Sequence, residues 1–70
     1  LSACKPTTPE QQYKGMTSEQ IFQKAEQASS QGKYSQAVKY YEGLQAIYPF
    51  GPNAEQAQLD IIYAYYKNGD

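Results

Sequence analysis

The chain has 70 residues and a net charge of −1, with six basic and seven acidic side chains interspersed along it. A chain of this length forms at most one small domain. The absence of histidine excludes zinc sites of the usual Cys/His kind, and the single cysteine excludes an internal disulfide. The sequence has no basic footprint for nucleic acid and no run of about 18 apolar residues that would span a membrane.

Residues 1–4, Leu-Ser-Ala-Cys, are similar to the lipobox at the end of a bacterial lipoprotein signal peptide. In that motif the cysteine carries the lipid, so the resemblance implies an acylated Cys4 and no other cofactor. Lys5 stands where an aspartate would retain a lipoprotein in the inner membrane, so the anchor is expected in the outer membrane. The alternative interpretation is an unmodified cysteine near a ragged terminus.

Residues 5–16 contain two prolines and mostly polar side chains without periodicity, which predicts a flexible tether. A helical pattern starts directly after it. Thr17 and Gln20 have the spacing of a capping box, and Met16 is placed to pack on Ile21.

Two helices are predicted in residues 17–48, joined by a short turn after Gly32. Their apolar faces are Ile21, Ala25 and Ala28 in the first helix and Tyr34, Ala37, Val38, Tyr41, Leu44 and Ile47 in the second. A connection this short makes the two helices antiparallel, and the alanines allow them to approach closely.

Pro49 and Pro52 make residues 49–53 a rigid corner, because proline fixes its own φ and displaces the preceding residue from helical conformation. Asn53 and Gln56 then predict a second capping box. A third helix is expected over residues 54–70. Its apolar stripe consists of Leu59, Ile62, Tyr63 and Tyr66, widened by Ile61 and by Tyr65, which is interpreted as a core residue like Tyr41. Asn68 and Gly69 are its stop signal.

The third helix repeats the first. Gly32 and Gly69 lie 37 positions apart, close to the period of about 34 residues of tetratricopeptide repeats. The fold class is therefore predicted as all-α, with one full tetratricopeptide repeat and the first helix of a second. Lys24 stands where Ile61 keeps the large apolar residue of the pattern, which indicates a terminal first repeat. Because each repeat buries its face against a neighbour, the chain is expected to be a fragment of a longer solenoid.

Residues 48–52 (Tyr-Pro-Phe-Gly-Pro) and 58–68 (Gln-Leu-Asp-Ile-Ile-Tyr-Ala-Tyr-Tyr-Lys-Asn) resemble the N-terminal part of the BamD (ComL) family. These are tetratricopeptide lipoproteins of the β-barrel assembly machinery. The resemblance covers residues 17–70 and reaches Cys4 through the lipobox. It implies a non-enzymatic scaffold on the periplasmic face of the outer membrane. Its partners would be a BamA-like barrel subunit and other assembly lipoproteins, contacted through C-terminal repeats, and unfolded outer-membrane proteins.

In this family the N-terminal repeats are linked to the β-signal, an extended C-terminal peptide with alternating aromatic and apolar residues. First helices line the groove of such repeats, which places Glu19, Phe22, Glu26, Ser29, Leu59, Tyr63, Tyr66 and Lys67 on it. Tyr48 and Phe50 are added because the prolines order the corner. Each has a structural alternative: Phe50 fills the gap between the units, Tyr48 packs locally, and Lys67 is a favourable cation at a helix end.

Two other classes of function are alternatives to this role. A different periplasmic tetratricopeptide lipoprotein, such as a secretin pilotin or a cell-envelope coordinator, fits the same repeats. An enzyme does not fit, because histidine is absent and no nucleophile–base pair or phosphate-binding glycine loop is present. No metal site or nucleic-acid partner is expected.

Overall fold

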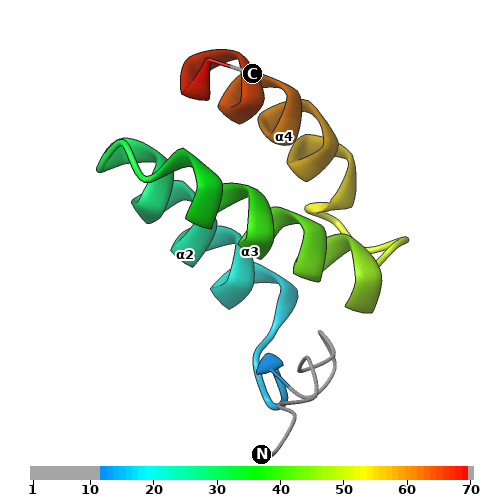
Figure 1. The fold of residues 1–70 in the computed structure, drawn as a ribbon. Coiled ribbons are helices and arrows are strands. Elements are labelled where there is room, and N and C mark those ends of the chain that lie inside the picture. The colour runs from blue at the N-terminus through cyan, green and yellow to red at the C-terminus, as the bar shows by residue number, and fades with distance from the viewer. Residues whose placement is uncertain (1–11, 70) are drawn as a thin grey trace, which may run out of the picture.

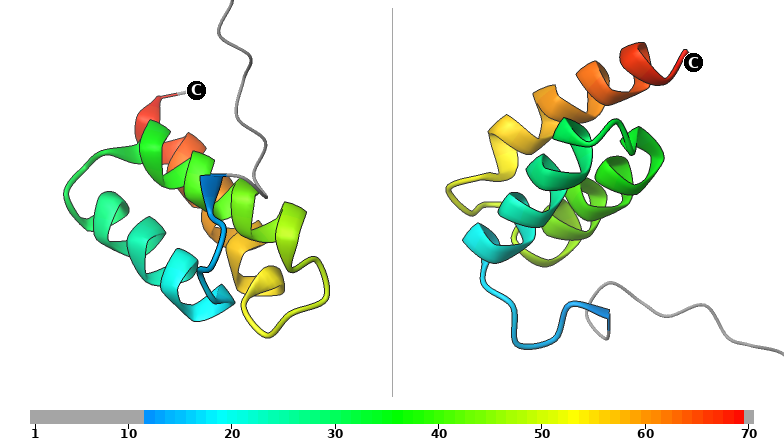
Figure 2. Two further views of the ribbon diagram at one scale, coloured as in Figure 1. Left: turned by 90° about the horizontal axis from the view of Figure 1, so that it is seen from below. Right: turned by 90° about the vertical axis from the view of Figure 1, so that its left-hand side faces the viewer.

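The computed structural model describes residues 12–69, which contain three α-helices: α2 (Ser18–Ser30), α3 (Tyr34–Ile47) and α4 (Ala54–Asn68). The central helix α3 packs against both α2 and α4 (Figures 1 and 2). The predicted all-α class, with one helix–turn–helix unit and the first helix of the next, is confirmed. Within residues 12–69, no helix is both long and apolar enough to cross a membrane.

Helix α2 begins and ends as predicted. The Thr17 hydroxyl accepts a hydrogen bond from the Gln20 amide at 3.1 Å, and the Gln20 side chain accepts one from the Thr17 amide at 2.9 Å. This reciprocal capping box satisfies two of the amides that a helix N-terminus leaves free. Gly32 follows the last turn with a φ of +78°, a conformation that glycine adopts at little cost.

Small side chains form most of the interface between the helices. The buried residues are Ile21, Ala25 and Ala28 in α2, Ala37, Val38, Tyr41, Gly43 and Leu44 in α3, and Ala54, Ala57, Ile61 and Ala64 in α4. Alanine and glycine shorten the distance between helix axes, which lets the few large residues fill the space that remains. The predicted core positions of α2 and α3 are confirmed, with Tyr34 and Ile47 only half-buried.

Most of the predicted apolar stripe of α4 lies outside the core. Leu59, Ile62, Tyr63, Tyr65 and Tyr66 are all exposed, and Ile61 alone of the six large residues is buried. The interpretation of Tyr65 as a core residue is therefore wrong, whereas the exposure of Leu59, Tyr63 and Tyr66 is compatible with their predicted place on the groove. Hydrophobicity favours the larger side chains, whereas close packing against α3 selects the helix face that carries three alanines.

The second predicted capping box is also absent. Asn53 precedes α4, but its side-chain oxygen accepts a hydrogen bond from the Ser18 hydroxyl at 2.9 Å instead of capping the helix. Gln56 donates to Asp60 at 2.9 Å. On the other side of the corner, Gln45 donates to the Ala54 carbonyl and to Gln58. The corner thus links α4 to both preceding helices through side-chain hydrogen bonds.

Residues 12–16, which we call the strap, pack on the helices and correct the C-terminal part of the predicted tether. The Tyr13 ring is 5% exposed and lies 5.8 Å from the Tyr40 ring, between centroids. It occupies the space above Gly43, where an added Cβ would overlap the ring. Gly43 therefore creates the notch that receives Tyr13. The remainder of the predicted tether, residues 5–11, lies outside the described part of the chain, as do residues 1–4.

The strap has a second attachment at its other end. The Tyr48 hydroxyl donates a hydrogen bond of 2.6 Å to the Met16 carbonyl. Tyr48 thereby joins the end of α3 to the start of α2. Two tyrosines thus hold five residues on the helices.

The notch predicts opposite effects of one substitution in two backgrounds. Gly43→Ala is expected to lower the free energy of unfolding by about 1–3 kcal/mol, because the new methyl group displaces the Tyr13 ring. In a Tyr13→Ala background the same change is expected to raise it by roughly 0.5–1 kcal/mol, because alanine is the better helix former. Urea unfolding of the four proteins measures both effects. Equal effects in the two backgrounds would show that the notch is not what Gly43 provides.

Candidate functional site

The 37-residue repeat register separates α4 into three faces. The buried face of α4 corresponds to Gln20, Lys24 and Gln27 of α2 and to Thr17, the residue that caps α2. The groove face of α4 consists of Gln56, Leu59, Tyr63 and Tyr66. It corresponds to Glu19, Phe22, Glu26 and Ser29 of α2. The third face, Gln58, Ile62 and Tyr65, corresponds to the α2 face that packs against α3. Ile62 and Tyr65 thus occupy positions that a second helix covers in the first repeat.

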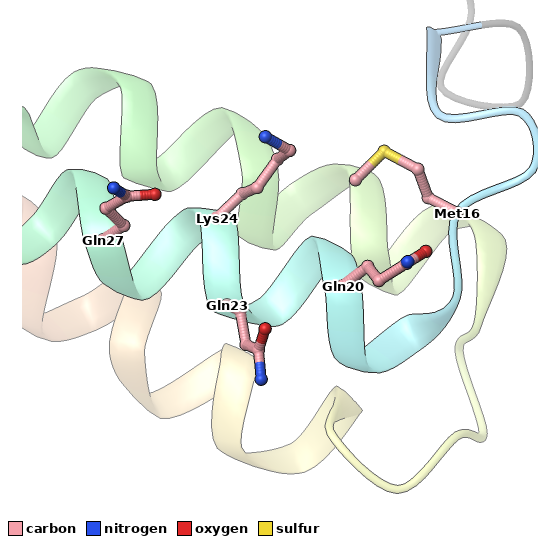
Figure 3. A pocket seen from close by; sticks show the side chains of 5 residues that line it. All are labelled: Met16, Gln20, Gln23, Lys24 and Gln27. Atoms are coloured by element: carbon pink, nitrogen blue, oxygen red, sulfur yellow. The ribbon is translucent and has the colours of Figure 1, made fainter.

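The α2 face in register with the buried face of α4 is polar. Met16, Gln20, Gln23, Lys24 and Gln27 line a shallow hollow along α2 (Figure 3). Lys24 stands at the register position of Ile61, which is buried against α3. An end repeat of a solenoid requires such a polar outer face, because no further repeat shields it from water. This composition fits the expectation that α2 forms the end of a stack.

A second hollow, of about 390 Å³, opens on the groove face. It is lined by Glu26, Ser29 and Ser30 of α2, Tyr34 and Tyr41 of α3, and Asp60 and Tyr63 of α4. We call it the acidic hollow. It brings together side chains from all three described helices, and its lining contains two carboxylates and no lysine.

The two carboxylates of the acidic hollow influence each other. Slight burial and the neighbouring Asp60 carboxylate, through its charge and hydrogen bonding, raise the pKa of Glu26, whose side chain is otherwise exposed. Burial raises the pKa of Tyr41, with further contributions from Asp60 and Glu26. One Asp60 oxygen accepts the hydrogen bond from Gln56, while Oδ2 is buried and accepts no hydrogen bond of good geometry.

The predicted groove residues of α4 are accessible. Leu59 and Tyr66 are 59% and 78% exposed, and Tyr63 is exposed beside the acidic hollow. The Lys67 ammonium lies 6.0 Å from the centroid of the Tyr63 ring, within reach of a cation–π interaction. Lys67 also belongs to the last turn of α4, so its structural alternative as a favourable cation at the helix end applies too.

The structure distinguishes the remaining predicted binding residues. Phe22 is half-buried, with its ring edge-on to Tyr41 at 5.9 Å, so it supports the core. Tyr48 is half-buried and bonded to Met16, as its local alternative required. Phe50 is 99% exposed, so it does not fill a gap between the described helices. Cys4 lies outside the described residues, and its acylation stays a prediction.

The sequence places three of the seven residues of the acidic hollow, Glu26, Ser29 and Tyr63, on the groove. It does not place Ser30, Tyr34, Tyr41 or Asp60 there. Asp60 precedes Tyr63 by three residues, a spacing that places both on one side of a helix. That spacing was the available signal. Among the described residues, no three acidic or cysteine side chains are grouped as metal ligands require.

The raised pKa of Glu26 predicts a dependence of stability on pH. The folded protein holds this proton more tightly than the unfolded chain, so the stabilising contribution is present at low pH and is lost as pH rises above the ordinary glutamate pKa, about 4.3. Glu26→Gln is therefore expected to raise the melting temperature at pH 7, by a few degrees at most because Glu26 is largely exposed.

The gain should shrink below pH 4, where Glu26 of the unaltered protein becomes neutral. Melting curves from pH 3 to 8 measure it. Glu42→Gln, on the exposed side of α3, controls for the loss of one negative charge elsewhere. A gain that is the same at pH 3 and pH 7 would contradict the predicted origin.

Comparison with known proteins places these features in a family. Residues 14–70 match the YfiO family, described as "Outer membrane lipoprotein". A relative from Vibrio cholerae, named outer membrane protein assembly factor BamD, is 47% identical over 51 residues, covering 73% of the chain and 21% of the relative. The protein of the same name from Neisseria meningitidis serogroup B is 38% identical over 52 residues, covering 74% and 20%.

The relative from Xylella fastidiosa strain Temecula1, which also carries the BamD name, is 33% identical over 69 residues, covering 99% of the chain and 24% of the relative. The chain thus spans about a fifth to a quarter of the length of these relatives. No solved structure matches it. The match over most of the chain shows that it belongs to the YfiO family of outer membrane lipoproteins, together with the BamD assembly factors.

Proposed function

We propose that the protein is a non-enzymatic scaffold and substrate receptor in the assembly of outer-membrane β-barrel proteins. The family description and the names of the relatives support this role. Lipid on Cys4 would hold the protein on the periplasmic face of the outer membrane, and no cofactor is required. The described residues supply the receptor part, and longer relatives leave room for further repeats that would contact a BamA-like barrel and other assembly lipoproteins.

The observation that carries the receptor role is the exposed row on the groove face of α4. Leu59, Tyr63 and Tyr66 follow each other at helical spacing and together expose aliphatic and aromatic surface. Tyrosine rings provide apolar faces for the side chains of an extended peptide, and their hydroxyl groups can bond its backbone. An unfolded outer-membrane protein with alternating aromatic residues offers matching chemistry.

Two further residues extend this surface. Lys67, one turn beyond Tyr63, is placed to attract the C-terminal carboxylate of the peptide. Phe50 projects from the corner, where prolines at positions 49 and 52 restrict the backbone before any peptide binds. A surface ordered in advance loses less conformational entropy on binding. Phe22 and Tyr48 then contribute indirectly, by stabilising the structure around the groove. The Phe22 ring packs against Tyr41, and the Tyr48 hydroxyl donates to the Met16 carbonyl.

Photocrosslinking tests this receptor role. A photoreactive residue at position 63 or 66 is expected to label a β-signal peptide several-fold more strongly than one at position 39, which is exposed on the far side of α3. The difference arises because only the first two positions lie on the groove face. The yield of crosslinked peptide, measured by mass spectrometry, should fall when unlabelled peptide competes. Equal labelling at positions 39, 63 and 66 would reject the groove as the binding surface.

A further inference from the structure

We propose that the acidic hollow binds the side chain of an arginine or lysine carried by the extended peptide. This inference rests on the proposed receptor function and adds a polar requirement to a surface otherwise described by apolar contacts. It concerns Glu26 and Asp60, which lie on different helices and line one hollow.

The first argument is an unsatisfied acceptor. Oδ2 of Asp60 is buried and accepts no hydrogen bond of good geometry, although the Tyr41 hydroxyl and the Glu26 carboxyl are near enough to Asp60 for hydrogen bonding to help raise their pKa values. The other oxygen accepts from Gln56 at 2.9 Å. A buried polar atom without a partner costs about 1–3 kcal/mol, so native structures rarely leave one without a reason. The terminal torsion of aspartate is broad, so the Asp60 carboxylate can adjust to a cation in the hollow that it lines. A guanidinium or ammonium group would then donate to it.

The second argument is uncompensated charge. Glu26 and Asp60 raise the pKa of Tyr41 in addition to the effect of burial, and Asp60 raises the pKa of Glu26. Both effects show that negative charge is concentrated here. No lysine contributes to the lining. A cation entering the hollow would relieve the repulsion between the two carboxylates and form charge-assisted hydrogen bonds with them.

The third argument is the aromatic wall. Tyr34 and Tyr41 of α3 and Tyr63 of α4 line the hollow together with the two carboxylates. Aromatic ring faces attract cations, and Tyr63 already has the Lys67 ammonium 6.0 Å from its centroid. Arginine matches this combination best, because its planar guanidinium stacks on rings and bonds carboxylates in a bidentate manner. An anionic group is disfavoured by the same charges.

The size of the hollow is consistent with one long side chain. Its volume of about 390 Å³ lies near the lower end of small-ligand pockets, roughly 300–1,000 Å³. A divalent metal fits less well, because the described residues provide no third ligand beside the two carboxylates. The peptide would therefore lie along Leu59 and Tyr63 and place one basic side chain between α2 and α4.

Paired peptides test the inference. Arginine is placed in turn at each polar position of a β-signal peptide, and each peptide is compared with its glutamine counterpart by fluorescence anisotropy at low and high salt. At the preferred position the unaltered protein is expected to bind the arginine peptide about tenfold more tightly. Asp60→Asn and Glu26→Gln should each remove most of this preference, whereas Glu42→Gln should keep it. High salt should reduce the preference.

The outcomes separate the inference from the proposed function. If arginine and glutamine peptides bind equally at every position, the basic-side-chain site is overturned and the receptor role stands. If no peptide binds, both are overturned. A preference that survives in both Asp60→Asn and Glu26→Gln also rejects this site. Glu26→Gln alters an exposed side chain and serves where Asp60→Asn disturbs folding, which circular dichroism reports.

Discussion

Close packing of small side chains against α3 is the constraint on which the rest of the structure depends. Five alanines of α2 and α4 are buried at its surface, and Gly43 opens a notch in α3 itself. With this little side-chain volume between the helices, the core needs few large residues. The aromatic and aliphatic residues that remain on α4 are therefore available for binding or for covering by another helix.

This distribution links the fold to the proposed function. A helix that contacts two neighbouring helices and a ligand must use a different face for each. The alanines of α4 pack against α3, whereas most of its larger residues lie on the two exposed faces. The same register in α2 places polar Gln20 and Lys24 where α4 has Ala57 and Ile61. The helices α2 and α4, which begin the first and the second repeat, are thus alike in shape. Only α4 has an apolar face that packs against a preceding repeat.

The acidic hollow depends on the same arrangement. Glu26 and Asp60 become neighbours because α3 holds α2 and α4 on either side of Tyr41, whose side chain is 2% exposed. Hydrogen bonds at the corner, from Ser18 to Asn53 and from Gln45 to the Ala54 carbonyl, fix how α4 leaves the first repeat. A change in that angle would separate the carboxylates, so the corner acts on the hollow without lining it.

The sequence alone determined the three helices, the capping of α2 and the repeat, because capping residues, glycines and local periodicity act within a few residues. The capping box expected at Asn53 did not form, because Ser18 of α2 donates to the Asn53 side chain. The sequence also predicted Tyr63 and Tyr66 as groove residues, and both are exposed. Tertiary structure decided which face of α4 is buried, because the choice between Ile61 and Ile62 depends on the surface of α3. It likewise placed Tyr13 over Gly43 and Glu26 beside Asp60. Such pairs are remote in sequence, and only packing between helices brings them together.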